Sequence, residues 1–342
     1  MLRLFVFLMP ARVYAPTPHN LRLLAAALRR GELVAIPTET VYGLAAHALN
    51  ARACRRIFTA KRRPDHDPLI VHVTDLRAAE ELAEFNAAAR VIARHFWPGP
   101  LTLVLPKKKT VPDIVTSGQD TVALRSPAHP LARRLLKLSG LPLAAPSANL
   151  FGYVSPTTAE HVRLGLSTRI KHILDGGACP VGVESTIIAV SPTGQLRVLR
   201  PGVISAAELL TVLRRAGLKA RVVSGKTPSA VLAPGLLDQH YSPHTPLTIT
   251  PRITVAQRKA ADADTALIFQ RKPAASGKNI FWFGTTDSLS DAAHNLYAVL
   301  RQVDAGKFIR MIVEAAPRSG GALTAAINDR LTRAAGKRRS AQ

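Results

Sequence analysis

The sequence is poor in cysteine. Its 342 residues include two, Cys54 and Cys179, which lie far apart and form no CxxC pair. This usage excludes a disulfide framework and a cysteine-based zinc module, and it suits a reducing compartment. The eleven histidines show no HExxH or comparable spacing of metal ligands. We therefore predict no metal site built by the protein alone.

Long apolar runs are also missing. No stretch approaches the roughly 18 apolar residues that a membrane span needs. The first fifteen residues, MLRLFVFLMPARVYA, imitate a short signal peptide, but Pro10 interrupts the apolar stretch. We interpret residues 1–11 as an edge strand or a misassigned start in preference to a secretion signal. The expected location is the cytoplasm, without membrane attachment.

Acidic residues are few. The 22 Asp and Glu stand against 46 Lys and Arg, which gives a net charge of +24. Such an excess attracts polyanions, including nucleotides, RNA and anionic membrane surfaces. A generally basic proteome, or solubility alone, would explain the charge equally well. Aromatic residues make up 5% of the chain, too few to suggest the base-stacking platforms of single-strand binders.

What the sequence does contain is typical of a folded α/β protein. Hydrophobic residues make up 47%, and the length suits one large or two ordinary domains. Short apolar runs such as LVAIP (33–37) and LIVHV (69–73) alternate with amphipathic stretches. Numerous strands with short helices between them favour a mixed sheet over a regular doubly wound one.

Capping residues and prolines predict where elements and domains begin. The expected helix starts are Asn20 before LRLLAAALRR, Asn50 before ARACRRIFTAK, and the capping boxes of Thr157 with Glu160 and of Ser205 with Glu208. A proline-rich stretch without periodicity predicts an extended linker. We predict a catalytic domain over 12–217, a linker or lid over 218–246, and a smaller α/β domain over 247–336.

Polar residues gather where predicted elements end. PTETVYGL (37–44) places two threonines, a carboxylate and a tyrosine in a tight turn after a strand, where α/β proteins usually bind ligands. Each such segment alone could be an ordinary polar loop. Together they supply cations and hydroxyls without a dominant acid pair, which suits triphosphate and carboxylate anions. We predict that they converge on one anion-binding cleft.

The same segments carry a family resemblance. PTETVYGL, the K-x-R-P-x-x-x-P-L segment, VALRSPAHPLAR, PLAAPSAN followed by SPTTAEHV, VESTII and LRPG occur in the order seen in YrdC-domain proteins. APG followed by HYSP, and the terminal AINDRLTRAA, resemble the linker and C-terminal domain of the long form, the threonylcarbamoyl-AMP synthases. The resemblance implies a YrdC-like mixed twisted sheet with flanking helices, plus a smaller Rossmann-like α/β domain.

The resemblance also implies a function. Members of the family are nucleotidyltransferases that condense L-threonine, bicarbonate and ATP, with Mg²⁺, into threonylcarbamoyl-AMP and pyrophosphate. The product serves the N6-threonylcarbamoyl modification of adenosine 37 in tRNA. A downstream tRNA threonylcarbamoyl-transferase complex is therefore an expected partner, and weak binding of tRNA or RNA by the basic surface is left open.

Roles of single residues follow from the same resemblance. Arg125 is expected to pair with the threonine carboxylate, because a guanidinium suits a planar anion. Lys61 and Arg63 are the expected catalytic cations, which neutralise the phosphates, and Tyr241 suggests a lid over the site. Threonine-binding positions are Thr38, His72, Arg125 and Ser185. ATP-binding positions are Lys61, Arg63, Ser147, Ser155, Arg200 and Tyr241, with Asn149 beside them.

The chain departs from the family pattern at a few positions. Arg62 and Asp67 stand where the family often has Gly and Asn, and Leu236-Leu237 replace the usual Met-Lys after APG. Asp67 is expected to repel phosphates unless it faces a metal ion or solvent. One rival interpretation is an RNA-binding or ribosome-associated protein with a YrdC-like fold and no ATP turnover. Another is a carbamoyltransferase, whose acylphosphatase module and cysteine pairs this sequence lacks.

Overall fold

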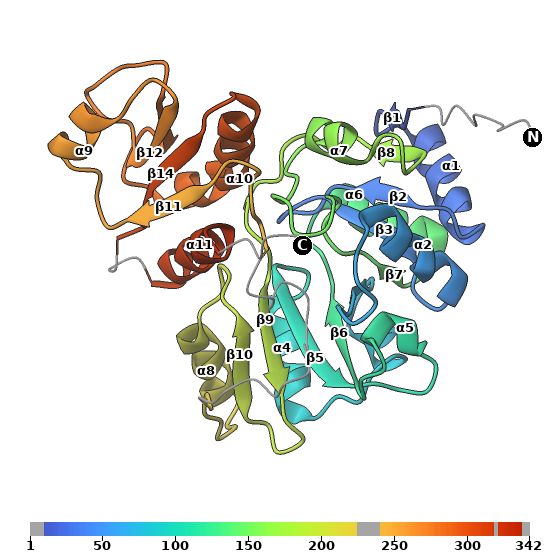
Figure 1. Cartoon of the computed structure of the whole chain (residues 1–342). Coiled ribbons are helices and arrows are strands. Elements are labelled where there is room, and N and C mark those ends of the chain that lie inside the picture. The colour runs from blue at the N-terminus through green and yellow to red at the C-terminus, as the bar shows by residue number, and fades with distance from the viewer. Residues whose placement is uncertain (1–9, 224–239, 318–320, 337–342) are drawn as a thin grey trace, which may run out of the picture.

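The computed structural model describes residues 10–223, 240–317 and 321–336. Within these ranges the chain forms two α/β units, each built on its own sheet (Figure 1). Residues 1–9, most of the predicted linker and the Leu236-Leu237 departure lie outside the described residues. Among the described helices, none has the length and apolar character needed to cross a membrane.

The first unit is built on a mixed sheet. Its described strands number ten and lie in the order β1-β8-β2-β3-β7-β4-β6-β5-β9-β10. Parallel and antiparallel neighbours are interspersed; β6 pairs parallel with β4 and antiparallel with β5. The predicted mixed sheet is therefore confirmed. The strands are β1 (Arg12–Tyr14), β2 (Val34–Ile36), β3 (Gly43–His47), β4 (Ile70–His72), β5 (Leu101–Pro106), β6 (Thr121–Arg125), β7 (Leu143–Ala144), β8 (His172–Leu174), β9 (Thr186–Val190) and β10 (Leu196–Arg200).

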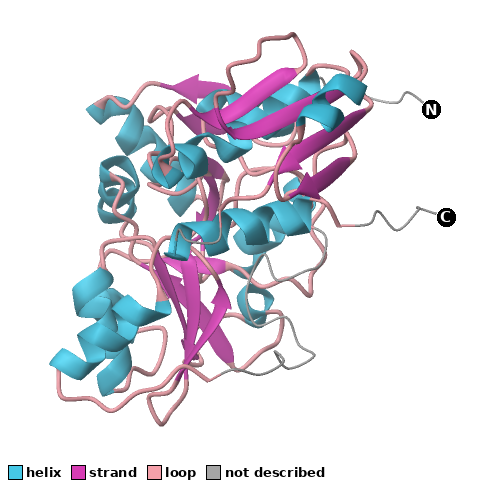
Figure 2. Cartoon of the chain, turned by 90° about the vertical axis from the view of Figure 1, so that its left-hand side faces the viewer, coloured by secondary structure: helices cyan, strands magenta, loops and turns pink. Residues whose placement is uncertain are grey.

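Short helices connect these strands and flank the sheet (Figure 2). They are α1 (Pro18–Arg29), α2 (Ala51–Lys61), α3 (Leu76–Glu80), α4 (Ala87–Phe96), α5 (Asp113–Thr116), α6 (Pro130–Ser139), α7 (Ala159–Leu166) and α8 (Ala206–Arg215). Two predicted helix starts are confirmed: the Asn50 side chain accepts the N–H of Ala53, and Ser205 forms a capping box with Glu208. These caps satisfy N–H groups that the first helical turn leaves without partners.

Two predicted helix starts are wrong. The first helix begins earlier than expected, because Thr17 caps it and Pro18 fits the first turn, where no N–H is needed. Asn20 therefore lies inside α1, and its N–H is donated to the Thr17 hydroxyl. In α7 the cap is Thr158, which accepts the N–H of His161, so the expected box starting at Thr157 is displaced by one residue.

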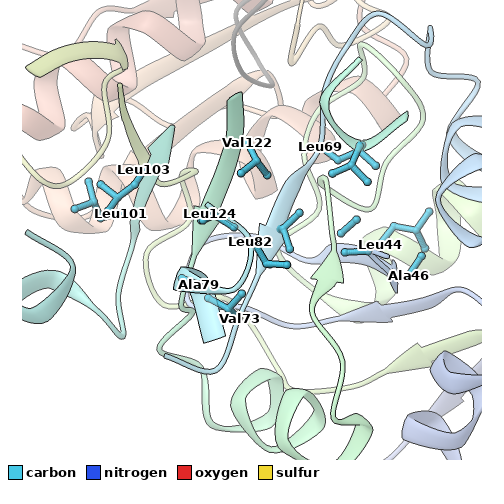
Figure 3. Packing of buried hydrophobic residues seen from close by; sticks show 14 of the residues in the cluster. Leu44, Ala46, Leu69, Val73, Ala79, Leu82, Leu101, Leu103, Val122 and Leu124 are labelled. Atoms are coloured by element: carbon cyan, nitrogen blue, oxygen red, sulfur yellow. The ribbon is translucent and has the colours of Figure 1, made fainter. Parts of the chain in front are cut away.

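Apolar side chains from both faces of the first sheet form its core. The largest cluster includes Leu44, Leu69, Leu103 and Leu124, which Figure 3 shows spread across the first sheet. Burying a leucine side chain contributes about 2 kcal/mol. A second cluster forms where α1 and α6 pack together against β2 and β7. The sheet is thereby fixed on both sides, and the loops at its strand ends are left to form the site.

The second unit is a small parallel α/β domain, as predicted. Its four described strands have the order β11-β14-β12-β13, and every pairing is parallel. The strands are β11 (Leu247–Thr250), β12 (Thr265–Arg271), β13 (Ile280–Gly284) and β14 (Arg310–Glu314), and the helices are α9 (Val255–Ala260), α10 (Leu289–Ala305) and α11 (Gly321–Ala334).

The two units share an apolar cluster. Val41, Val154 and Val183 of the first unit pack in the same cluster as Leu296 and Tyr297 of α10. The approach is close at Gly182, where a Cβ atom would lie 2.3 Å from the Ala293 carbonyl oxygen. Figure 1 shows α10 and α11 between the sheet of the second unit and the first unit. The second domain is therefore held against the loops of the first.

Sheet pairing continues beyond the predicted end of the first domain. Leu196 of β10 donates its N–H to the Arg221 carbonyl and accepts the N–H of Val223, at 3.0 and 2.8 Å. The described residues just after 217 thus add to the edge of the first sheet. β11 begins at Leu247, where the second domain is expected to start. The three predicted domain ranges themselves stay predictions.

Candidate active site

The turn 37–42 forms one wall of the site. It joins β2 to β3, and the Thr38 hydroxyl organises it by accepting the N–H groups of Thr40 and Val41 at 3.1 and 3.2 Å. The same hydroxyl donates to the Val41 carbonyl at 2.6 Å. Such side-chain to backbone bonds fix a turn without help from the sheet. Thr38 is buried and lines the pocket described below.

Strand ends supply the opposite walls. His72 and Arg125 are direct partners in the pairing of β4 with β6, so they lie side by side. Ser185 immediately precedes β9, and its hydroxyl lies 2.8 Å from that of Thr102 on β5. Arg200 ends β10 and donates to both the carbonyl and the hydroxyl of Ser185, each at 3.2 Å. The pairing of these strands therefore brings residues that are far apart in the sequence to one edge of the first sheet.

These walls line a small pocket with a cavity volume of about 40 Å³. Besides the predicted site residues, Thr40, Glu184 and His240 line it. The pocket is shared by residues predicted for threonine and for ATP. Eight of the eleven predicted residues line it, namely Thr38, Arg63, His72, Arg125, Ser147, Ser185, Arg200 and Tyr241.

The other three predicted residues lie behind the pocket wall. Lys61 is 1% exposed and donates to the carbonyls of Ser147 and Asn149, at 2.5 and 2.6 Å. Burial, followed by the nearby Arg63 cation, lowers the pKa of the Lys61 ammonium. The Asn149 amide donates to backbone carbonyls of its own loop. The Ser155 hydroxyl donates to the buried carboxylate of Glu184. In this state Lys61 anchors the loop that carries Ser147.

Two of the pocket arginines are paired with carboxylates of the same chain. Arg125 lies 2.7 Å from Glu39, and Arg63 lies 2.9 Å from Asp67, with all four side chains buried. Arg63 also donates to the backbone carbonyl of Asp67 at 3.0 Å. Asp67 is therefore turned toward Arg63 and away from solvent, and the expected repulsion of phosphates stays a prediction. Burial raises the pKa of the Asp67 carboxyl, while Arg63 opposes that shift.

Glu184 is the most heavily bonded carboxylate of the site. It accepts hydrogen bonds from the Ser155 hydroxyl, the Tyr297 hydroxyl and the Arg330 Nε, at 2.7, 2.7 and 2.9 Å. Burial alone would raise its pKa, but Arg330, Arg200 and the bond from Ser155 outweigh burial and hold the pKa at about 2. Glu184 is therefore ionised at neutral pH.

Several buried polar atoms of the pocket have no hydrogen-bond partner among the described residues. They are the Nδ1 atoms of His72 and His240 and the hydroxyl of Tyr241. Tyr241 also adopts a left-handed backbone conformation, with φ of 63°. Buried polar groups usually have partners, and strained backbone concentrates at functional sites. Both features indicate a pocket arranged for a polar ligand.

Sequence reasoning assigns no role to two acids of the site. It names the carboxylate of Glu39 in PTETVYGL without a function, and it selects Ser185 in VESTII instead of the adjacent Glu184. Their position next to selected residues was a usable signal. Tyr297 lies in no quoted motif, and Arg330 lies in AINDRLTRAA, which indicates the second domain but no role at the pocket.

Taken with the fold, this site defines a class: an α/β protein with a buried, arginine-lined pocket for anions at the strand ends of a mixed sheet. A family model named Sua5_yciO_yrdC, described as "Telomere recombination", matches residues 26–202. A second, described as "Threonylcarbamoyl-AMP synthase, C-terminal domain", matches residues 204–336.

Individual relatives agree with these matches. The chain is 40% identical to a threonylcarbamoyl-AMP synthase of Pyrococcus abyssi over 93% of this chain and 95% of the relative. A Bacillus subtilis threonylcarbamoyl-AMP synthase is also 40% identical, over 92% of each chain. The crystal structure of P. abyssi Sua5 with L-threonine superposes with a TM-score of 0.85 at 36% identity, over 95% of this chain and 98% of that one.

The chain therefore belongs to the threonylcarbamoyl-AMP synthase family, in its two-domain form, and members of this family are nucleotidyltransferase-type enzymes. The Escherichia coli protein YciO shares the fold of the first domain, with a TM-score of 0.52 at 21% identity over 58% of this chain and 100% of that one.

We expect folding stability to fall on mild acidification because buried histidines stay neutral. Burial lowers the pKa of His240 from 6.5 to about 3. Between these values the unfolded chain takes up a proton that the folded protein does not, so stability rises with pH in this window. From pH 6.5 to 5, one such histidine costs about 2 kcal/mol.

Urea unfolding of wild type and His240→Gln at pH 6.5 and 5 measures this effect. The variant should lose less stability on acidification than wild type, by about 2 kcal/mol. Carboxylates and the other histidines are common to both proteins, so their contributions cancel in the difference. Identical losses in both proteins would mean that His240 is not held neutral in the folded state.

Proposed function

We propose that this protein condenses L-threonine, bicarbonate and ATP into threonylcarbamoyl-AMP and pyrophosphate. The observation that carries the proposal is one pocket that is lined by Arg63, Arg125 and Arg200 together with Ser147 and Ser185. These guanidinium groups suit one triphosphate and one carboxylate side by side. The relatives named as threonylcarbamoyl-AMP synthases, and the threonine complex of one of them, support the same reaction.

In this proposal Arg125 receives the threonine carboxylate. Its Nε and Nη1 groups donate to the Gly99 carbonyl and the Thr40 hydroxyl, and its Nη2 is ion-paired with Glu39 at 2.7 Å. A guanidinium has five N–H donors, so three are not used in these two hydrogen bonds and can bind a substrate carboxylate. His72, adjacent to Arg125 on the sheet, is held neutral because burial and the Arg125 charge lower its pKa to about 3. Thr38 and Ser185 would complete the threonine half of the pocket.

Arg63 and Arg200 would hold the phosphates of ATP, with Ser147, Ser155 and Tyr241 around the nucleotide. Lys61 lies behind the pocket wall and uses two of its three N–H donors on backbone carbonyls, so it would reach a phosphate oxygen with the third only if the loop that carries Ser147 moved. Within the described residues, no three His, Cys, Asp or Glu side chains are grouped to hold a metal ion. This donor set fits Mg²⁺ that arrives on the triphosphate, the usual manner for this ion.

The proposed chemistry needs positioning and charge neutralisation. The threonine nitrogen takes up CO₂ derived from bicarbonate and becomes a carbamate. A carbamate oxygen then attacks the α-phosphorus, the bond to the bridging oxygen breaks, and pyrophosphate leaves with its charge neutralised by Lys61 and Arg63. A carbamate is short-lived in water, so a closed pocket would favour the reaction. Tyr241 is fully buried at the pocket and would form part of that closure.

The product defines the next step. Threonylcarbamoyl-AMP is a mixed anhydride that water destroys, so a partner must consume it promptly. We propose transfer to N6 of adenosine 37 in tRNA by a threonylcarbamoyl-transferase complex. Because ATP and tRNA are available there, this proposal places the protein in the cytoplasm.

The direct test is pyrophosphate release by the purified protein. Release from ATP should require both L-threonine and bicarbonate, and the adenylate product should appear in equal amount. Pyrophosphate release that ignores threonine or bicarbonate would contradict the proposal. RNA binding without any ATP turnover would favour the rival interpretation.

Substitution of the two halves of the pocket should separate the two substrates. Lys61→Ala should raise the KM for ATP and lower kcat, and Arg125→Ala should raise the KM for threonine, each by about tenfold to a hundredfold for a lost charged contact of 1.5–3 kcal/mol. Arg62→Gly is the matched control, because Arg62 neighbours both cations of that segment but is exposed. Indifference to both alanine variants would mean that the site is misplaced.

The Arg63–Asp67 pair leads to a different expectation. A phosphate bound to Arg63 would compete with the Asp67 carboxylate, which carries the same sign of charge. Asp67→Asn removes that repulsion and should lower the KM for ATP by about threefold to tenfold. Arg63 keeps its bond to the Pro68 carbonyl at 2.7 Å in this variant. Steady-state kinetics at several Mg²⁺ concentrations would measure the effect. A rise in KM that depends on Mg²⁺ would instead make Asp67 a metal ligand.

A further inference from the structure

Two arginines of the second domain reach into the first. Arg301 on α10 donates to the carbonyls of Val154 and Ser155, the latter at 3.2 Å. Arg330 on α11 donates to the Glu184 carboxylate at 2.9 Å and to the Pro201 carbonyl at 2.7 Å. Both side chains are buried, and Arg330 is 0% exposed. Neither of them lines the pocket.

These contacts fall on the loops that carry the proposed ATP site. Ser155 donates its hydroxyl to Glu184, so Arg330 and Ser155 share one carboxylate. Pro201, whose carbonyl Arg330 holds, directly follows Arg200. Arg330 is thus linked through Glu184 to Ser155 and through Pro201 to Arg200, and both of these residues have proposed roles in nucleotide binding. A surface interaction would not require a side chain so fully buried.

Tyr241 rests on the same group of residues. Its ring stacks on that of Tyr297 with centroids 5.6 Å apart, and the Arg330 guanidinium carbon lies 5.5 Å from the Tyr241 ring centroid. Tyr297 in turn donates its hydroxyl to Glu184 at 2.7 Å. Because Tyr241 has a left-handed backbone, contacts around it must hold that conformation in place.

The charge of Glu184 gives the arrangement a second effect. Glu184 lines the pocket, where an uncompensated carboxylate would repel a triphosphate. Arg330 supplies the compensating cation from outside the pocket. Loss of that cation would leave the Glu184 charge compensated by Arg200 alone, as well as a Ser155 and a Tyr241 that are less well held.

We infer that Arg330 is a positioning residue through which the second domain completes the ATP half of the pocket. It acts through Glu184 on Ser155 and through its contact with the Tyr241 ring, without touching a substrate. This inference rests on the proposed function, because the ATP roles of Ser155 and Tyr241 belong to that proposal. It predicts that a defect at Arg330 affects nucleotide binding selectively, whereas a merely structural residue would affect both substrates alike.

The test measures equilibrium binding of a non-hydrolysable ATP analogue and of L-threonine, each alone, to the full chain by calorimetry. Arg330→Met should weaken binding of the analogue about tenfold and change threonine binding less than twofold. Arg330→Lys keeps the charge but loses the guanidinium fork, so its loss should be intermediate. Arg310→Met is the matched control, because Arg310 lies in the same domain and pairs with Asp262 at the surface.

A milder variant protects the test against loss of folding. Tyr297→Phe removes one donor from Glu184 and keeps the ring that stacks on Tyr241, and it should weaken binding of the analogue about threefold. Unchanged binding of the analogue in both Arg330→Met and Tyr297→Phe would overturn the inference, as would equal losses for the two ligands. A wild type that binds neither ligand would overturn the proposed function, and this inference with it.

Discussion

The site depends on the buried hydrogen bonds and the ion pair of the Glu184 carboxylate. Removing one partner from a buried ion pair costs about 3–5 kcal/mol, because the other charge is left unpaired. Glu184 avoids that cost with three donors, and these come from a loop of the first domain and from two helices of the second. A single carboxylate therefore joins both domains at the wall of the pocket.

This junction explains why the site needs more than its own sheet. Ser155 and Ser185 lie in loops beyond the strand ends, and Ser147 lies in a loop that is attached to the sheet by an isolated bridge with Gly43. Lys61 fixes the first loop through two backbone carbonyls, and Arg301 and Glu184 fix the second. Buried charged side chains therefore hold these loops where sheet pairing is limited. The second domain thus contributes to the pocket directly, whatever other role it has.

Local sequence patterns allowed prediction of the α/β class. Most pocket residues were predicted from segments that follow strand ends and that carry the family resemblance. The sequence could not show which charges would meet. Glu184 and Arg330 are 146 positions apart, and Arg125 reaches the turn at Thr40 across 85 positions. The shift from Thr157 to Thr158 in capping α7 has a smaller cause: two adjacent threonines offer the same hydroxyl, and tertiary packing selects one. The pairing of Asp67 with Arg63 is likewise not evident from the sequence, which assigns Arg63 to phosphate alone.

The internal pairs also bear on how the pocket would bind its ligands. Replacing a buried ion pair by apolar residues is often neutral or stabilising, so such pairs are weak evidence of a role in stability. An arginine side chain carries about 2 kcal/mol of rotamer entropy, which a flexible guanidinium would lose on meeting an anion. Glu39 and Asp67 hold Arg125 and Arg63 in place before any ligand arrives, so that loss is incurred during folding. The two carboxylates therefore lower the affinity for anionic ligands by competing with them, but they keep the arginine side chains oriented before a ligand binds.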